Sequence, residues 1–292
     1  MAQKNSHESF GGRLRKWFFI IRPFTLSASV APVLTGWAVA LSVTRRLNWP
    51  VAVVTLLCAM CLQVLSNLIN DYCDFRKGND DEDRLGPARA ISKGEVTSKE
   101  MFRAIAIVAL LAVGMGCFLV WKGGWPIVAI GITALLFAWL YSATSHSLSH
   151  LGVADLFSLS YYGFIASAGT CFLLTGSWMD EALWLGLGCG SIATGILNVN
   201  NIRDVEQDAK HGKKTLIVRL GVGFGRVYYA CCLLLPVVML WLTQWRSWWA
   251  TAGLGVVAVG LYLLFLRSSG RQYNRILMLT GFFDLLYALI VL

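Results

Sequence analysis

Nine long runs of apolar residues constrain the fold of this chain more than any other feature. They lie near residues 17–43, 49–70, 101–121, 125–143, 155–176, 181–199, 227–243, 248–266 and 275–292. A helix needs about 20 apolar residues to cross a hydrocarbon core of about 30 Å. Because 57% of the residues are hydrophobic and only 14% are charged, we expect an all-α polytopic membrane protein and exclude an ordinary soluble domain.

The basic residues predict how the nine spans are oriented. The amino terminus shares one side with the connections after the second, fourth, sixth and eighth runs. Only four of the 25 Lys and Arg residues fall on the other side: Arg45, Arg46, Lys122 and Arg246. The positive-inside rule therefore places a polar head, residues 1–16, in the cytoplasm and the end of the chain outside. The net charge of +9 then reflects topology and anionic lipid, and no nucleic-acid partner is expected.

Residues 17–292 are expected to form a single transmembrane domain. Its first run passes Pro23 and Pro32 and is too long for a cleavable signal peptide. We therefore expect this run to remain in the protein as one helix.

Two short polar segments concentrate carboxylates at the ends of the second and sixth runs. Each places an Asn four residues before an Asp, with another Asp three or four residues later: Asn67, Asp71 and Asp74 in NLINDYCDFRKGNDDED, and Asn200, Asp204 and Asp208 in NVNNIRDVEQD. Residues at this spacing share one face of a helix. Each segment therefore offers several oxygen ligands that point in one direction.

The residue types of these segments indicate a site for divalent metal. Carboxylates at membrane depth cost about 2.5 kcal/mol or more each, so they are expected to face a polar cavity and serve a function. Mg²⁺ is usually held by one or two carboxylates together with water and substrate phosphate. Two such helix ends facing each other would hold a diphosphate through Mg²⁺. A solvated loop is the alternative for the acids at 80–83, and we favour it for Asp81 and Glu82.

Basic residues alternate with these acids and offer donors to phosphate oxygens that a metal leaves free. The candidates are Lys77, Arg84, Arg89, Lys93, Arg203, Lys213 and Lys214. The alternative for each of them is the ordinary enrichment of Lys and Arg in cytoplasmic loops.

The long connections at about 71–100 and 200–226 repeat one order of residues. Each runs from an apolar helix through Asn and Asp to further acids and a basic, Gly-containing stretch. This order indicates two related halves around one site. Many transporters also consist of repeated halves, so an ion-coupled membrane transporter is the alternative from another class. A transporter predicts acids near the bilayer midplane, whereas these acids gather at one face.

Both polar segments resemble the signature regions of a known family. SNLINDYCDFRKGNDDEDRLGPAR, with KGEVT just after it, and LNVNNIRDVEQDAKHGKKTLIVRLG are similar to the two motifs of the UbiA superfamily of intramembrane prenyltransferases. Within that superfamily they are most similar to the MenA-type 1,4-dihydroxy-2-naphthoate polyprenyltransferases. The segment IRPFTLSASVAPVLTG resembles the first helix of the same branch.

This resemblance implies a bundle of nine transmembrane helices around a central cavity that is open to lipid, with the diphosphate at the cytoplasmic mouth. The implied ligands are Asn67, Asp71 and Asp74 for one Mg²⁺, and Asp204 and Asp208 for the other, assisted by Asn200 or Asn201. The wider superfamily has its third ligand at the position of Phe75. The MenA-like branch has it at Asp74, and Asp80 is a possible substitute.

The implied reaction transfers a polyprenyl group from polyprenyl diphosphate to 1,4-dihydroxy-2-naphthoate. The acceptor loses CO₂, which gives demethylmenaquinol in menaquinone synthesis. This pathway implies a bacterial cytoplasmic (inner) membrane, with membrane lipid around the protein and no protein partner predicted. Neither the length of the polyprenyl chain nor the oligomeric state follows from the sequence.

The region after the fourth run departs from the family pattern. Tyr141 matches a Tyr of the family and would lie over the allylic cation or touch the diphosphate, with a buried structural Tyr as the alternative. The family continues with an Arg-Pro-Tyr stretch and a second Tyr before a Gly and an Asp. This chain has HSLSH from His146 to His150 and keeps Gly152 and Asp155. Another aromatic acceptor, such as 4-hydroxybenzoate, is therefore an alternative.

Overall fold

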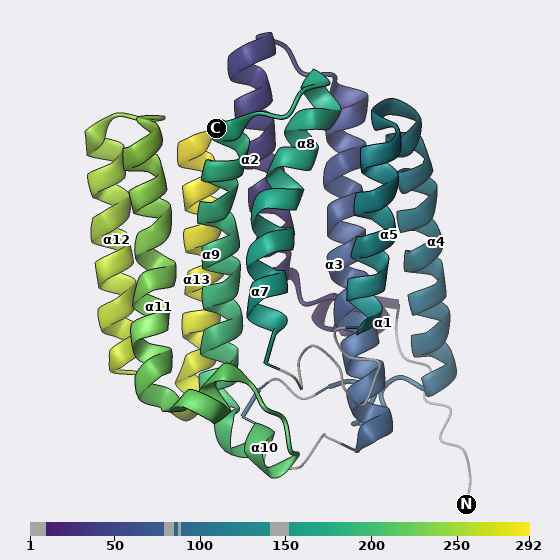
Figure 1. Ribbon diagram of the computed structural model, residues 1–292. Coiled ribbons are helices and arrows are strands. Elements are labelled where there is room, and N and C mark those ends of the chain that lie inside the picture. Colours follow the sequence, from purple (N-terminus) through teal and green to yellow (C-terminus); the bar gives the residue numbers. More distant parts are fainter. Residues whose placement is uncertain (1–9, 79–84, 87–88, 141–151) are drawn as a thin grey trace, which may run out of the picture.

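The structure is a computed structural model that describes residues 10–78, 85–86, 89–140 and 152–292 (Figure 1). These residues form helices and turns and no strand, which confirms the all-α prediction. The helices are α1 (Phe10–Ile21), α2 (Ser27–Thr44), α3 (Trp49–Lys77), α4 (Ser98–Gly123), α5 (Trp125–Leu140), α7 (Ala154–Leu159), α8 (Ala166–Thr175), α9 (Asp180–Arg203), α10 (Val205–Lys210), α11 (Leu216–Thr243), α12 (Trp248–Leu266) and α13 (Tyr273–Val291). Three shorter elements are η1 (Pro23–Leu26), the π-helix η2 (Ser160–Ile165) and η3 (Gly270–Gln272).

Eight helical segments among the described residues are long and apolar enough to cross a membrane, judged by length and composition. One of them combines α7, η2 and α8. The remaining apolar run corresponds to α5, which has 16 residues and is shorter than the others. The polytopic helical architecture is confirmed.

The first apolar run forms one candidate membrane span, Lys16–Thr44, but it is broken into two helices rather than continuous. α1 ends at Ile21, Arg22 has a left-handed φ of 55°, and η1 leads into α2. Pro23 explains the position of the break, because proline disfavours a helical conformation at the residue before it. Proline itself fits the first turn of a new helix, where its missing N–H is not needed.

Three other helices extend beyond their apolar runs. α3 continues to Lys77 and ends at Gly78, whose φ is 68°. α9 continues to Arg203, and both polar segments therefore begin inside a helix. α11 begins at Leu216, where Thr215 caps the first turn by accepting a hydrogen bond from the Val218 N–H, and it is kinked at Gly221, whose φ of 85° and ψ of 164° are not helical.

Small residues allow the central helices to pack closely. α9 contacts α2, α11, α13 and η2, and it lies near the middle of the bundle, with α11 and α12 on one side and α3, α4 and α5 on the other (Figure 1). Gly190 of α9 meets Gly163 of η2 so closely that a Cβ on Gly190 would lie 2.4 Å from the Leu159 carbonyl oxygen. Close approach through small residues is typical of helix interfaces in membranes.

Asp284 is a single acid inside the last apolar run. The side chain lies on α13 and is completely buried. In the part of the chain that the structure describes, neither carboxylate oxygen has a hydrogen-bond partner.

The close contact at Gly190 predicts that this position tolerates no side chain. Gly190→Ala should lower the thermal unfolding midpoint of the purified protein in detergent, because overpacking of this kind costs about 1 to 3 kcal/mol. Gly114→Ala on α4 is the matched control, since its Cβ would meet nothing within 4 Å. Equal midpoints for the two variants would contradict the packing described here.

Candidate active site

The first polar segment begins at the carboxyl-terminal end of α3, and three of its side chains line one large cavity. Asn67, Asp71 and Asp74 are buried and face this cavity. Phe75, the position of the third ligand in the wider superfamily, is 38% exposed and does not line it. The helix therefore presents Asp74 rather than Phe75 beside Asp71.

Two arginines from other segments neutralise the first pair of carboxylates. Arg22, at the break after α1, forms an ion pair with Asp71. Arg89, from the connection before α4, places Nε 2.8 Å from Asp71 Oδ1 and Nη2 2.5 Å from Asp74 Oδ2. The Arg89 side chain is only 4% exposed. A buried carboxylate needs such a partner, because an isolated charge in a low-dielectric interior is strongly unfavourable.

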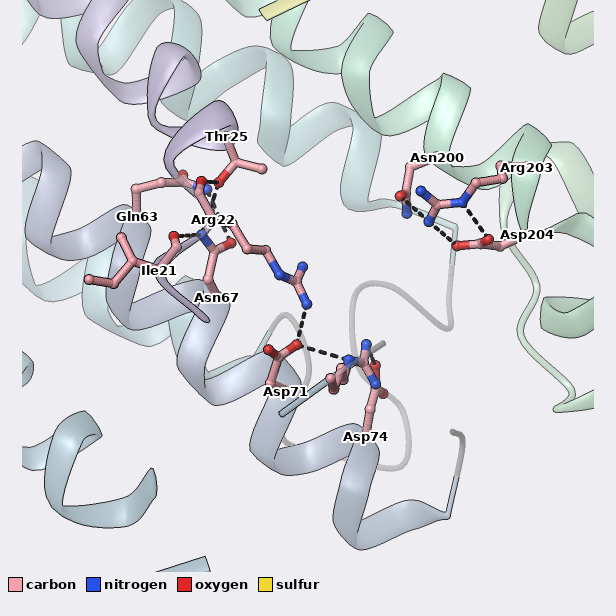
Figure 2. A network of polar contacts seen from close by, with 11 residues as sticks. Ile21, Arg22, Thr25, Gln63, Asn67, Asp71, Asp74, Asn200, Arg203 and Asp204 are labelled. Atoms are coloured by element: carbon pink, nitrogen blue, oxygen red, sulfur yellow. Dashed lines mark hydrogen bonds and ion pairs between the residues drawn. The ribbon is translucent and has the colours of Figure 1, made fainter. Parts of the chain in front are cut away.

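A chain of hydrogen bonds holds Asn67 in place. Its amide nitrogen donates to the Ile21 carbonyl at 3.1 Å and to Thr25 Oγ1 at 2.9 Å. Its amide oxygen accepts from Gln63 Nε2 at 3.4 Å, and Gln63 in turn accepts from the Tyr162 hydroxyl at 2.5 Å. The break in the first run is therefore what brings Ile21 and Thr25 to α3 (Figure 2).

The second polar segment is organised by Arg203 at the end of α9. This guanidinium donates to both oxygens of Asp204, at 2.7 and 2.6 Å, and to Asn200 Oδ1 at 2.7 Å. Its third nitrogen donates to Asn274 on α13 at 2.6 Å. Asn274 also donates to the Leu85 carbonyl at 3.1 Å, in the connection that follows α3. Arg203 thereby links the two polar segments through α13.

The spacing had suggested that Asp204 and Asp208 lie on one continuous helix, but they do not. Asp204 caps the end of α9 and α10 starts at the next residue. Asp208 is still brought to the cavity, where it pairs with Lys213 at 3.0 Å. Burial raises the pKa of Asp208 above its ordinary value, while the Lys213 ammonium acts in the opposite direction.

The two polar segments face each other at one end of the cavity, whose volume is about 1060 Å³. Figure 2 shows Asn67, Asp71 and Asp74 on one side of the gap and Asn200, Arg203 and Asp204 on the other. Deeper in the bundle, the cavity walls are mostly apolar and come from α2 to α5, α7, η2, α8 and α9. The site therefore combines a charged mouth with an apolar chamber.

The donors at this mouth fit Mg²⁺ that is shared with a phosphate group. Among the described residues, no three His, Cys, Asp or Glu side chains converge into a complete metal cage. Mg²⁺ does not need such a cage when substrate phosphate and water supply the remaining ligands. Each side of the gap offers buried carboxylate and amide oxygens, which is the ligand type that Mg²⁺ prefers.

Only some of the other candidate residues line the cavity. Lys93, Asn201 and Lys213 line the cavity, together with the residues described above. Lys77 and Lys214 are exposed and lie outside its lining. Several candidates fall outside the described residues: Asp80, Asp81, Glu82, Asp83, Arg84, Tyr141 and the segment from His146 to His150.

Four cavity residues were missed by the reasoning from sequence: Arg22, Gln63, Tyr162 and Asn274. An arginine directly before a proline inside an apolar run was a usable signal for Arg22, because such a proline predicts a helix break. Gln63 lies four residues before Asn67, so the same helical spacing extends to it. Tyr162 and Asn274 lie far away in the sequence and carry no comparable signal.

Comparison with known proteins agrees with this geometry. The UbiA prenyltransferase family model matches residues 29–285. The chain belongs to the UbiA prenyltransferase family. It is 36% identical to a 1,4-dihydroxy-2-naphthoate octaprenyltransferase of Haemophilus influenzae, over 80% of this chain and 78% of that one. It is 34% identical to the Escherichia coli protein of the same name, over 78% and 76% of the two chains.

Solved structures share the fold at low sequence identity. A UbiA homolog from Archaeoglobus fulgidus bound to GPP and Mg²⁺ has a TM-score of 0.65 and 15% identity, covering 94% of this chain and 98% of that one. The apo structure of a UbiA homolog from Aeropyrum pernix has a TM-score of 0.62 at the same identity and the same coverage. The resemblance noted in the sequence is thus confirmed at the level of family and fold.

The position of Arg89 predicts that its positive charge stabilises the fold by compensating Asp71 and Asp74, and that a divalent cation can supply the same charge. Arg89→Met should destabilise the protein by about 3 to 5 kcal/mol, because it removes a buried cationic partner from both Asp71 and Asp74. Arg267→Met, at an exposed arginine, is the control. Thermal unfolding should also show that Mg²⁺ stabilises Arg89→Met more than the wild type. A variant that unfolds like the control, or that ignores Mg²⁺, would contradict this assignment.

Proposed function

We propose that this protein transfers a polyprenyl group from polyprenyl diphosphate to 1,4-dihydroxy-2-naphthoate in menaquinone synthesis. One observation carries the proposal: two Asn/Asp segments, far apart in the sequence, face each other at the mouth of an apolar cavity. The identity of 34 to 36% to proteins named 1,4-dihydroxy-2-naphthoate octaprenyltransferase supports this acceptor. A UbiA homolog of the same fold was solved with GPP and Mg²⁺.

The diphosphate would bind at the charged mouth. Asn67, Asp71 and Asp74 would hold one Mg²⁺, and Asp204 and Asp208 the other, with Asn200 or Asn201 assisting. Bound Mg²⁺ would supply positive charge to the departing diphosphate. The cationic side chains that line the mouth would contact the remaining phosphate oxygens. Those side chains are Arg22, Arg89, Lys93, Arg203 and Lys213.

The polyprenyl tail would occupy the apolar chamber and leave it sideways. Val113 on α4 and Ile132 on α5 line the cavity and are 45% and 54% exposed. An opening between these two helices would let a long tail remain in lipid. The apolar walls would also keep water from the allylic carbocation until the aromatic ring attacks it.

The acceptor would react at the ring carbon that carries its carboxylate. The allylic C–O bond breaks and its electron pair leaves with the diphosphate. A ring made electron-rich by two hydroxyl groups then captures the allylic carbon, and the carboxylate is lost as CO₂. The product is demethylmenaquinol.

We place the protein in a bacterial cytoplasmic membrane with its amino terminus and charged mouth in the cytoplasm. The excess of Lys and Arg on that side supports this orientation. The transporter alternative receives no support from the site, because the acids of both motifs lie at the ends of α3 and α9 rather than at their centres.

The proposal predicts strict dependence on the motif carboxylates. Purified protein given polyprenyl diphosphate, 1,4-dihydroxy-2-naphthoate and Mg²⁺ should release CO₂ and prenylated product in equal amounts. Chelation of the metal should stop both. Asp71→Asn and Asp204→Asn should each lower turnover at least about 100-fold. Each removes a negative charge that would hold the Mg²⁺ bound to the diphosphate.

Glu206→Gln is the matched control, because Glu206 lies two residues from Asp204 but is exposed and outside the cavity. It should retain wild-type turnover. Metal-independent turnover, or full activity of Asp71→Asn, would contradict the proposal. Product from 4-hydroxybenzoate but none from the naphthoate would retain prenyl transfer and replace the acceptor.

A further inference from the structure

One buried acid in the cavity belongs to neither Asn/Asp motif. Asp155 is the second residue of α7, it is only 6% exposed, and it lines the same cavity as both motifs. α7 begins at the end of the bundle where α10 lies (Figure 1). Gly152, with a φ of 74°, packs so closely on the next connection that a Cβ would lie 2.4 Å from the Lys214 carbonyl oxygen. This contact holds the start of α7 against the connection between α10 and α11.

The partners of Asp155 leave its carboxylate able to accept a proton. The Tyr228 hydroxyl on α11 is placed to donate to it. Among the described residues, no ion pair reaches it, in contrast to Asp71, Asp74, Asp204 and Asp208. An acid in the first turn commonly stabilises a helix through its dipole. Stabilisation of a helix dipole does not require burial in a cavity. Asp180 occupies the first turn of α9 and is exposed.

Other polar side chains continue the line from Asp155 into the chamber. Ser158 and Tyr162 follow at three and seven residues, and both line the cavity. Side chains at this spacing share a face of a helix. The π-helix η2 begins between them, and such elements are frequent at functional sites. An aromatic molecule with several oxygen substituents would find hydrogen-bond partners along this wall and apolar contacts elsewhere.

We propose that Asp155 is the catalytic base that accepts the proton from the acceptor hydroxyl beside the attacked ring carbon. The inference rests on the proposed function, and it adds the residue that handles the proton. Tyr228 would orient the Asp155 carboxylate through its hydrogen bond. Ser158 would contact the acceptor one helical turn further along the same wall.

The proton and electron movements balance without another reactant. As the ring carbon bonds to the allylic carbon, the hydroxyl proton passes to Asp155 and that oxygen becomes a carbonyl. The product of this step carries a carboxylate on the carbon next to the carbonyl. Loss of CO₂ returns the electron pair of the broken C–C bond to the ring as an enolate. The enolate then takes the proton back from Asp155, which restores both the hydroxyl and the base.

Asp155→Asn tests this role, with turnover and metal-dependent substrate binding measured on the same preparations. Turnover of 1,4-dihydroxy-2-naphthoate should fall about 100-fold or more, the usual contribution of a general base. Mn²⁺-dependent binding of a prenyl thiolodiphosphate, followed by calorimetry, should be unchanged, because Asp155 does not contact that end of the site. Asp155→Glu should recover part of the turnover. Asp180→Asn should leave both readouts unchanged.

Methylated acceptors separate a chemical role from a structural one. Methylation of the hydroxyl beside the carboxylate should slow the wild type, and Asp155→Asn should slow this ether no further, because its proton is already absent. Undiminished turnover by Asp155→Asn, additive losses with the ether, or loss of thiolodiphosphate binding would each overturn the proposal. Wild-type protein that forms no product would contradict the proposed function, whereas an active wild type beside a fully active Asp155→Asn contradicts this inference alone.

Discussion

Compensation of buried carboxylates by guanidinium groups is the interaction on which the rest of this site depends. Asp71 and Asp74 on α3 and Asp204 at the end of α9 lie at the mouth of an apolar cavity, where uncompensated charge is unfavourable. Arg22, Arg89 and Arg203 supply the opposite charge from three separate segments. The pairs of Arg22 and Arg89 hold the break after α1 and the connection before α4 against α3, while the pair of Arg203 lies within the end of α9.

The division of the cavity into a charged mouth and an apolar chamber follows from the bilayer. Charged groups are tolerated near the ends of the spans, where they are paired or hydrated, while the walls deeper inside remain apolar. This arrangement suits a substrate with a diphosphate at one end and a hydrocarbon tail at the other. Hydrogen bonds from Arg203 through Asn274 to Leu85 connect the two polar segments. Binding of one diphosphate would therefore involve both halves of the chain.

The sequence predicted the features that depend on local pattern. The apolar runs predicted the spans because lipid requires long helices, and the Asn/Asp spacing predicted that Asn67, Asp71 and Asp74 share a face. Features that depend on distant contacts were not predictable in this way. Asn274 and Tyr162 became visible only when α13 and η2 were placed against the motifs. The end of α9 and the start of α11 also differ from the ends of their apolar runs. Asp204 forms the turn that ends α9, and Thr215 caps α11 before its apolar run begins.

The central claim is that the two motifs hold one diphosphate jointly through divalent metal. Anomalous diffraction from crystals grown with Mn²⁺ and a prenyl thiolodiphosphate tests it most directly. The account predicts two Mn²⁺ peaks, one beside Asp71 and Asp74 and one beside Asp204 and Asp208, with the diphosphate between them. A diphosphate bound without metal at either motif, or metal bound elsewhere in the bundle, would contradict it.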